Sequence, residues 1–405
     1  MLTWNNLSFR VLDAGVRWFY SVAFWHESGP SGLLFVGDLV TGEGKLPDAF
    51  GFEASYGGIA WVDIAATVRS VAQLDPAHLL PATGETLPRP AAALVQLATR
   101  IGEFLKPTPA RQFTPPFIPE KFGRYFHHGD SVYQISNFGN VILFIDKQGR
   151  GLLVDPGPCD YENPRRKEDF QSDLDLFEAK AGFKKIELVL VTHMHGDHYD
   201  LWPGVQNRYP ACKLGAWSPQ ADLIENPSDF PYACLLPWYA AGWECCPVDK
   251  RVEIGTPFLW NAVEIHTTHL PGHCFVHAGY WIEWHGRRIL ISGDSIQTSG
   301  APDNLQCILS NHSIPGTDEG HAWAYHNALE IDADLNLGGH SSFFMHCREV
   351  YAASLLRIES QTTALVSLFD ALRPEEIFLR PSLRPAAERV RKSIKPSMQQ
   401  EVTPV

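Results

Sequence analysis

A dense run of potential metal ligands lies in the middle of the chain. His193, His195, Asp197 and His198 fall within six residues, at the spacing His-x-His-x-Asp-His. Imidazole and carboxylate groups are ligands that suit zinc, iron or manganese. Although the chain has 17 histidines, a chance match to this spacing has a probability on the order of one in a thousand. The motif therefore predicts a metal site rather than a polar, histidine-rich loop.

The residues before the motif predict how it is positioned. Residues 186–191 form a short apolar run rich in β-branched side chains, which is typical of a buried strand. Where the chain is still extended, His193 and His195 point to the same side. The glycine that follows lets the backbone turn, so that Asp197 and His198 face a second point in space. We therefore expect the motif at the end of a strand.

Composition limits the classes of partner. A chain of 405 residues is long enough for two or more domains. Its net charge of -13 argues against nucleic acid as a partner. No apolar run is long enough to cross a membrane, and the first residues lack the basic start and apolar core of a signal peptide. We expect a cytoplasmic protein that acts on a small molecule and has no membrane or nucleic-acid partner.

The cysteines indicate neither a zinc knuckle nor a redox pair. All eight lie after residue 150, and none forms a Cys-x-x-Cys motif. Cys245 and Cys246 are adjacent, and we interpret them as reduced structural thiols.

Patterning divides the chain into a short first unit, a linker, a larger second unit and a tail. In residues 1–105, runs 7–12 and 33–36 predict strands and runs 59–74 and 91–104 predict helices. Five prolines make 106–120 a stiff linker. Residues 121–372 alternate strands and helices, including helices over 167–181 and 349–371, which indicates an α/β layered domain. The basic, proline-bearing segment 373–405 predicts a solvated tail.

An aromatic stretch interrupts the second unit. Phe230, Tyr232, Trp238, Tyr239 and Trp243 crowd together with two prolines. A loop packed on the core is the simpler interpretation, and a wall of a substrate pocket is the alternative.

Several motifs share one order with a known family. These are Val154–Gly157, Thr192–His198, His269–His273, Gly293-Asp294 and Gly339-His340. Over roughly residues 120–345 the chain resembles the metallo-β-lactamase superfamily of metal-dependent hydrolases. The resemblance implies an α/β fold, an αββα sandwich with the metals at one edge of its two sheets.

The resemblance also implies a ligand set for two ions, two Zn²⁺ or alternatively iron or manganese. The first ion would be held by His193, His195 and His273. The second would be held by Asp197, His198 and His340, and Asp294 would bridge the two. Between the ions, a hydroxide formed near neutral pH would attack the substrate. Asp197 would be catalytic, orienting the nucleophile or passing on its proton. Asp155 would hold a ligand by a hydrogen bond rather than bind metal.

These residues predict a dinuclear hydrolase of an ester, thioester, lactone or related bond. Asp294 favours the general hydrolase branches of the family, because the β-lactamases proper usually lack this aspartate. Two alternatives stay open: a phosphodiesterase, and an iron-dependent oxidoreductase of the same fold that resembles a persulfide dioxygenase. Metal analysis separates zinc-dependent hydrolysis from iron-dependent redox chemistry.

The first unit resembles half of the second. Shifted by 256 positions, Trp4 meets Trp260 and Gly37-Asp38 meets Gly293-Asp294. Residues 1–105 therefore predict an internal duplication, a degenerate C-terminal half of another such domain. Its ligands are not kept, since Arg17 falls at the position of His273 and Thr83 falls at the position of His340.

This half-domain is expected to bind no catalytic metal. Its sheet lacks the half against which it would pack, so its apolar face needs another partner. The candidates are the catalytic domain of the same chain and the same segment of a second chain, which would make a homo-oligomer.

Overall fold

The computed structural model describes most of the chain. The described residues are 1–14, 22–27, 32–46, 61–87, 89–104, 119–137, 139–157, 163, 165–227, 246–274, 276–296, 321–345 and 347–368. The aromatic stretch 230–243, the proline-rich segment up to residue 118 and the tail 373–405 lie outside them.

An eight-stranded sheet carries the histidine motif. Its strands, in the order β6 to β13, are Glu120–Phe122, Tyr125–His127, Val132–Ile135, Ile142–Ile145, Arg150–Val154, Lys185–Leu190, Lys213–Trp217 and Lys250–Val252. Strands β10 to β13 run parallel. Each parallel connection contains one helix, α3 (Arg166–Lys180), α4 (Trp202–Arg208) or α5 (Ser218–Glu225). Strands β8 and β9 are buried at every position, as expected for strands covered on both faces.

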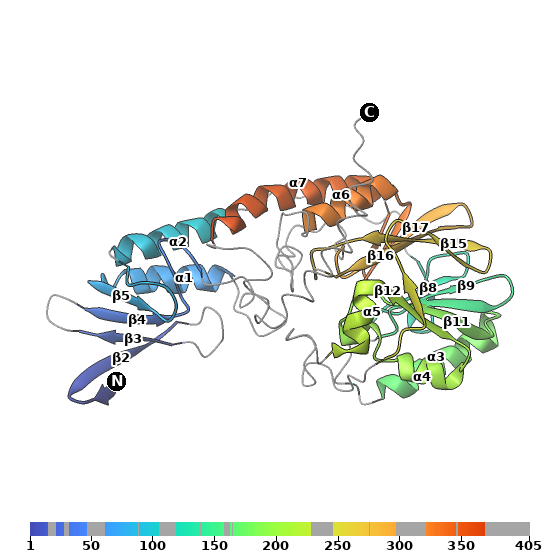
Figure 1. The fold of residues 1–405 in the computed structure, drawn as a ribbon, viewed down its shortest axis with the longest axis horizontal. Helices are drawn as coiled ribbons and strands as arrows, with labels where there is room; N and C mark the ends of the chain where they lie inside the picture. Colours follow the sequence, from blue (N-terminus) through green and yellow to red (C-terminus); the bar gives the residue numbers. More distant parts are fainter. Residues whose placement is uncertain are drawn as a thin grey trace.

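A six-stranded sheet supplies the rest of the second unit. Its strands, in the order β14 to β19, are Phe258–Trp260, Val263–His269, Ala278–Trp284, Arg287–Gly293, Leu335–Gly338 and Phe343–Phe344. His285 and Gly286 both have positive φ angles, 51° and 80°, which suits a two-residue hairpin turn between β16 and β17. Helices α6 (His321–Ile331) and α7 (Cys347–Val366) pack together over the outer face of this sheet (Figure 1).

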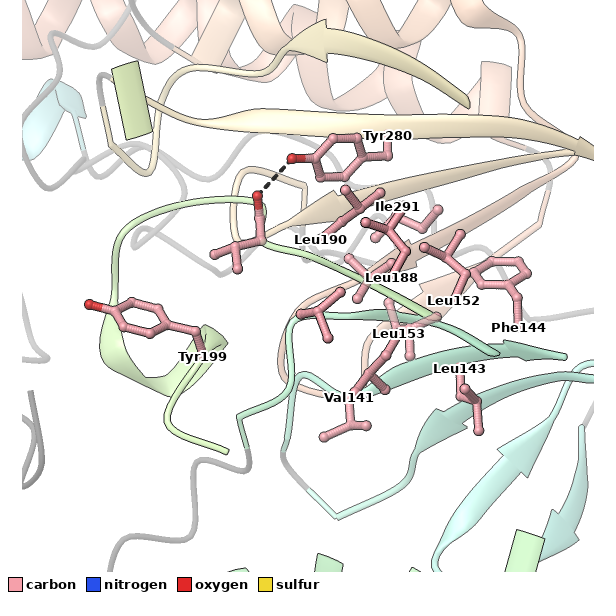
Figure 2. Packing of buried hydrophobic residues seen from close by; sticks show 14 of the residues in the cluster. Val141, Leu143, Phe144, Leu152, Leu153, Leu188, Leu190, Tyr199, Tyr280 and Ile291 are labelled. Atoms are coloured by element: carbon pink, nitrogen blue, oxygen red, sulfur yellow. Dashed lines mark hydrogen bonds between the residues drawn. The ribbon is translucent and has the colours of Figure 1, made fainter. Parts of the chain in front are cut away.

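The inner faces of these two sheets bury each other. Figure 2 shows Phe144 and Leu152 of the first sheet packed beside Ile291 of the second. The Tyr280 hydroxyl crosses between the sheets and donates to the Val191 carbonyl at 2.8 Å. With helices on both outer faces, the arrangement is the αββα sandwich, and this prediction is confirmed.

A third sheet is built from the first unit. Its strands, in the order β1 to β5, are Leu2–Trp4, Leu7–Asp13, Val22–His26, Leu33–Gly37 and His78–Pro81. Helices α1 (Trp61–Ala72) and α2 (Pro90–Phe104) cover one of its faces (Figure 1). Strand order and register repeat those of β14 to β18: Val11 pairs with Phe24 as Thr267 pairs with Tyr280. Even the irregularity between β4 and β5 recurs between β17 and β18.

The helical layers of the two units meet. Helix α2 packs against α7, and the buried residues around them form one continuous apolar cluster (Figure 1). The Leu46 amide donates to the Leu368 carbonyl at 2.7 Å. Among the described residues, the first unit therefore meets the second mainly through its helical layer.

Most predicted elements are confirmed, with boundaries shifted by a few residues. Helices α1, α2, α3 and α7 lie in the four predicted helical runs as far as the described residues extend. One boundary is wrong: Glu120 begins strand β6, because it pairs with His127, and so belongs to the sandwich rather than to a linker. The four cysteines among the described residues are reduced thiols, and no described helix is long and apolar enough to span a membrane.

The packing between the sheets predicts one stability effect. Phe144 is fully buried and contacts the Trp284 ring edge-on, with centroids 5.4 Å apart. We expect Phe144→Ala to lower the free energy of unfolding by about 3–5 kcal/mol, because it leaves a cavity between the sheets. Urea denaturation measures this change in the free energy of unfolding. Leu259→Ala, at an exposed position of β14, is the control and should change stability by less than about 0.5 kcal/mol. A loss below about 1 kcal/mol for Phe144→Ala would contradict this account of the core.

Candidate metal centre

The histidine motif lies where strand β11 ends. His193 still forms a β-bridge, with His277 of the second sheet. His195 has extended backbone angles, φ -71° and ψ 141°, and Gly196–His198 then make one 3-10 turn. Strand followed by turn is the arrangement that the sequence predicts, and the turn brings the His198 ring back to His193, with centroids 4.0 Å apart.

A buried carboxylate beside the motif fixes its geometry. Asp155 follows β10, the strand next to β11. Its Oδ1 accepts from the Thr192 amide and its Oδ2 from the Thr192 hydroxyl, both at 2.7 Å. The same Oδ2 lies 3.0 Å from His198 Nδ1. Asp155 is thus placed to hold a ligand rather than to be one.

These contacts also orient two imidazoles. The Thr192 hydroxyl donates to Asp155, so it can only accept from His193 Nδ1, which lies 3.2 Å away. His198 Nδ1 faces the same carboxylate at 3.0 Å, which favours the protonated ring. The Nε2 atoms of both rings therefore face away from Asp155 and toward the site.

The remaining ligands come from the second sheet. His273 follows β15, Asp294 follows β17 and His340 follows β18, so all three lie at the edge of the sandwich next to the motif. His340 has a φ of 53°, an uncommon value for a residue with a side chain. Its amide donates to the Asn140 side-chain oxygen at 2.6 Å, which holds this conformation.

The seven predicted ligands converge. They form three overlapping groups, and within each group the ligand atoms lie within 4.8 Å of one another: His193, His195 and His273; His193, His198 and Asp294; and Asp197, His198 and His340. Asp294 lies centrally, with Oδ2 2.9 Å from His340 Nε2 and 3.5 Å from His273 Nε2. Its Oδ1 lies 3.5 Å from His198 Nε2.

Burial and neighbouring charges divide the imidazoles into two kinds. Burial and the other imidazoles lower the pKa of His273 to about 3 and that of His193 well below its usual value. Burial also opposes protonation of His198, but Asp155, Asp294 and Asp197 outweigh it and raise its pKa. The pKa of Asp294 lies well below its usual range, because the surrounding imidazoles outweigh its burial. Neutral imidazoles and an ionised carboxylate are the forms that bind metal.

The arrangement fits a metal centre. His193 Nε2 is fully buried and has no hydrogen-bond partner among the described residues. A buried polar atom without a partner costs about 1–3 kcal/mol, and a metal ligand bond removes this cost. The donors are nitrogens and carboxylate oxygens, which suit zinc, iron or manganese.

Two glycines of the predicted motifs allow the chain to come this close. A Cβ at Gly157 would overlap the Asp197 carbonyl. At Gly339 it would overlap the Asp294 carboxylate. Any side chain at either position would push the ligand-bearing loops apart.

Two further residues belong to the site, although sequence reasoning did not assign them. Asn140 Nδ2 donates to the Asp197 carbonyl at 3.0 Å and lies 3.3 Å from its carboxylate. The sequence showed Asn140 only as part of a turn. His277 stacks on His193, with centroids 4.8 Å apart, and its Nε2 accepts from the Asp294 amide at 3.3 Å. It is fully buried, so it supports ligands and does not face a substrate.

The third sheet has no comparable centre among its described residues. None of the three ligand groups includes a residue of the first unit. Asp38 follows β4 as Asp294 follows β17, but Thr83 stands after β5, where the second unit has His340. Arg17 lies outside the described residues.

Comparisons with known proteins find similar solved structures and one family. Among solved structures, a motif mutant of the metallo-β-lactamase from Cronobacter sakazakii is 14% identical, with a TM-score of 0.41, and the match covers 69% of this chain and 98% of that one. BJP-1, a subclass B3 metallo-β-lactamase of Bradyrhizobium japonicum, is 19% identical, with a TM-score of 0.38 and coverage of 72% and 97%. No curated protein matches the chain. These identities are too low to transfer a substrate.

The family model of the metallo-β-lactamase superfamily matches residues 136–368. This range is more than half of the chain, and it holds all seven converging side chains together with Asp155 and Asn140. The chain therefore belongs to the metallo-β-lactamase superfamily.

Proposed function

We propose that the protein is a dinuclear metal-dependent hydrolase of a small molecule with an ester, thioester, lactone or related bond. The observation that carries the proposal is the overlap of the three ligand groups. One outer group is all histidine, the other holds Asp197, and Asp294 lies between them, with its Oδ2 near His273 of the first and His340 of the second. This spacing supports two ions bridged by one carboxylate.

Zinc is the metal we propose, with iron or manganese as alternatives. When bound, the ions would lower the pKa of a coordinated water and stabilise negative charge that develops on the substrate. Their holders would be His193, His195 and His273 on one side and Asp197, His198 and His340 on the other, with Asp294 shared.

The protein's own residues would direct the reaction from the accessible side. The side chains of Asp197, His273 and His340 are 12%, 17% and 20% exposed, whereas that of His198 is fully buried. A substrate would therefore approach past the three exposed groups. The Asp197 carboxylate, held by Asn140, is the group that we propose to take up or orient a proton at Oδ2.

We propose further that residues 1–105 are a partial, degenerate second copy of the fold and have no catalytic role. The shared strand order and register of β1–β5 and β14–β18 support this origin. The location we propose is the cytoplasm, which the reduced cysteines among the described residues fit.

Turnover of a substrate panel by zinc-loaded protein tests the reaction class. The panel contains carboxylic esters, thioesters, lactones, a β-lactam and phosphodiesters. Hydrolysis of one of the first three supports the proposal, and cleavage of phosphodiesters alone would reassign the protein to the alternative hydrolase class. Bound iron with visible absorbance and no hydrolysis would favour the oxidoreductase.

The metal content is the first prediction from this proposal. We expect about two metal ions per chain, because seven donors of suitable type converge. Asp294→Ala should remove at least about one ion, since the shared carboxylate is lost. Asp38→Ala, the same change at the equivalent turn of the first unit, is the matched control and should leave the content unchanged. Elemental analysis of protein purified without chelator measures all three. Contents near zero in the unaltered protein would refute the metal centre.

A second prediction concerns the proposed proton acceptor. Asp197→Asn keeps the shape of the side chain and removes its charge. We expect kcat to fall roughly 100-fold to 10,000-fold on whichever substrate the panel identifies. Asp175→Asn, an exposed position of α3, serves as the control in the same steady-state assay. Unaltered turnover in Asp197→Asn would show that this carboxylate has no catalytic role.

The third prediction concerns the asparagine that sequence reasoning missed. Asn140→Ala removes the contacts to Asp197 and to the His340 amide, so these two ligands should be less well positioned. We expect metal affinity to fall about 10-fold to 100-fold, in the range for residues that orient ligands. Competition with a chelating dye measures this, and Asn327→Ala on α6 is the control. Equal affinity in Asn140→Ala and the unaltered protein would contradict the positioning role.

A further inference from the structure

The sheet of the first unit has one covered face and one open face. Alternate residues such as Ala23, Leu34 and Val36 are buried beneath α1 and α2. The residues between them point the other way. We call these the open face: Leu2, Trp4, Leu7, Phe9, Val11, Asp13, Val22, Phe24, His26, Leu33, Phe35, His78 and Leu80.

The open face is apolar although it is accessible. Trp4 is 64% exposed, Val11 is 44% exposed and Phe35 is 38% exposed. Ten of its thirteen residues are apolar, two are histidines, and Asp13, at the end of β2, is the one charged side chain among them. Contiguous exposed apolar surface of this kind marks an interaction site in a folded protein.

The same chain shows what covers such a face. At the same offset, Trp4, Val11 and Phe35 correspond to Trp260, Thr267 and Ile291. These three are at most 5% exposed, because the face of β14–β18 on which they lie packs against the eight-stranded sheet. Two sheets with the same strand order and register thus differ in one respect: one inner face is covered by a second sheet and the other is not.

We infer that the open face packs against the open face of a second copy of this chain. Among the described residues there are three sheets. Two of them cover each other, and the open face of another copy is a sheet face of matching character. Isologous pairing about a two-fold axis then joins two first units into a four-layer arrangement of helices, sheet, sheet and helices.

Geometry and size fit this occupant. Two identical sheets with the usual twist pack face to face at about 30° without distortion. A standard interface buries roughly 800 Å² per partner, and the open face offers four exposed or half-exposed aromatic rings, those of Trp4, Phe9, Phe24 and Phe35. The helices α1 and α2 lie on the opposite side, so attachment to α7 leaves the open face accessible (Figure 1).

Sedimentation velocity of the full-length protein over a range of concentrations tests the inference. The purified chain should be a dimer, and Val11→Lys should raise the dimer dissociation constant by at least about 100-fold, because each dimer would bury two unpaired ammonium groups. Leu356→Lys is the matched control, since Leu356 is 69% exposed but lies on α7. It should leave the dissociation constant unchanged.

Far-ultraviolet circular dichroism shows whether each variant is folded. If Val11→Lys fails to fold, Trp4→Lys decides the matter, because Trp4 lies on edge strand β1 and is largely exposed already. A purified chain that is monomeric at every concentration would overturn the inference, and capture of a different protein by that monomer would not rescue it. If Val11→Lys folds and still dimerises, the inference is overturned as well. The same holds for a persistent Trp4→Lys dimer if Val11→Lys does not fold.

Discussion

The Asp155 carboxylate is the contact on which the metal centre depends. One buried side chain joins the end of β10 to the end of β11 through the Thr192 amide and hydroxyl, and it also fixes the ring of His198. Through Thr192 it sets the tautomer of His193 as well. A carboxylate in this environment is costly unless each of its oxygens is satisfied, and here each accepts from the motif. The contacts that satisfy the buried carboxylate also hold the two imidazoles in one orientation.

The two sheets bring the remaining ligands to this point. Every ligand follows the end of a strand, so the rigid part of the fold ends where the chemistry begins. Asn140 joins the two halves, because its amide contacts Asp197 from the first sheet and the His340 backbone from the second. His277 stacks on the ring of the ligand His193 and accepts a hydrogen bond from the Asp294 amide. Residues that bind no metal thus determine how closely the loops of the two sheets approach.

The first unit repeats the second without its chemistry. Its strands keep the order and register of β14–β18, but the positions that follow them hold Asp38 and Thr83 rather than a complete ligand set. What is retained is an apolar sheet face and a helical layer, and the helical layer is continuous with the core around α7. Keeping apolar side chains on an accessible face is unfavourable for an isolated chain. Their presence is most simply explained by a partner surface of the same kind.

The sequence by itself determined the features that depend on near neighbours. The His-x-His-x-Asp-His spacing, the apolar run 186–191 and the offset between Trp4 and Trp260 each depend on local geometry or on direct comparison of positions, and each can be read without coordinates. Distant contacts could not be read in this way. Asn140 lies 57 residues from Asp197 and 200 residues from His340, and an asparagine in a turn carries no signal of such partners. The sequence also left two partners open for the first sheet. Only the tertiary structure decided that helix α2 meets α7 while the apolar sheet face stays open, because burial follows from how elements pack and not from their individual patterns.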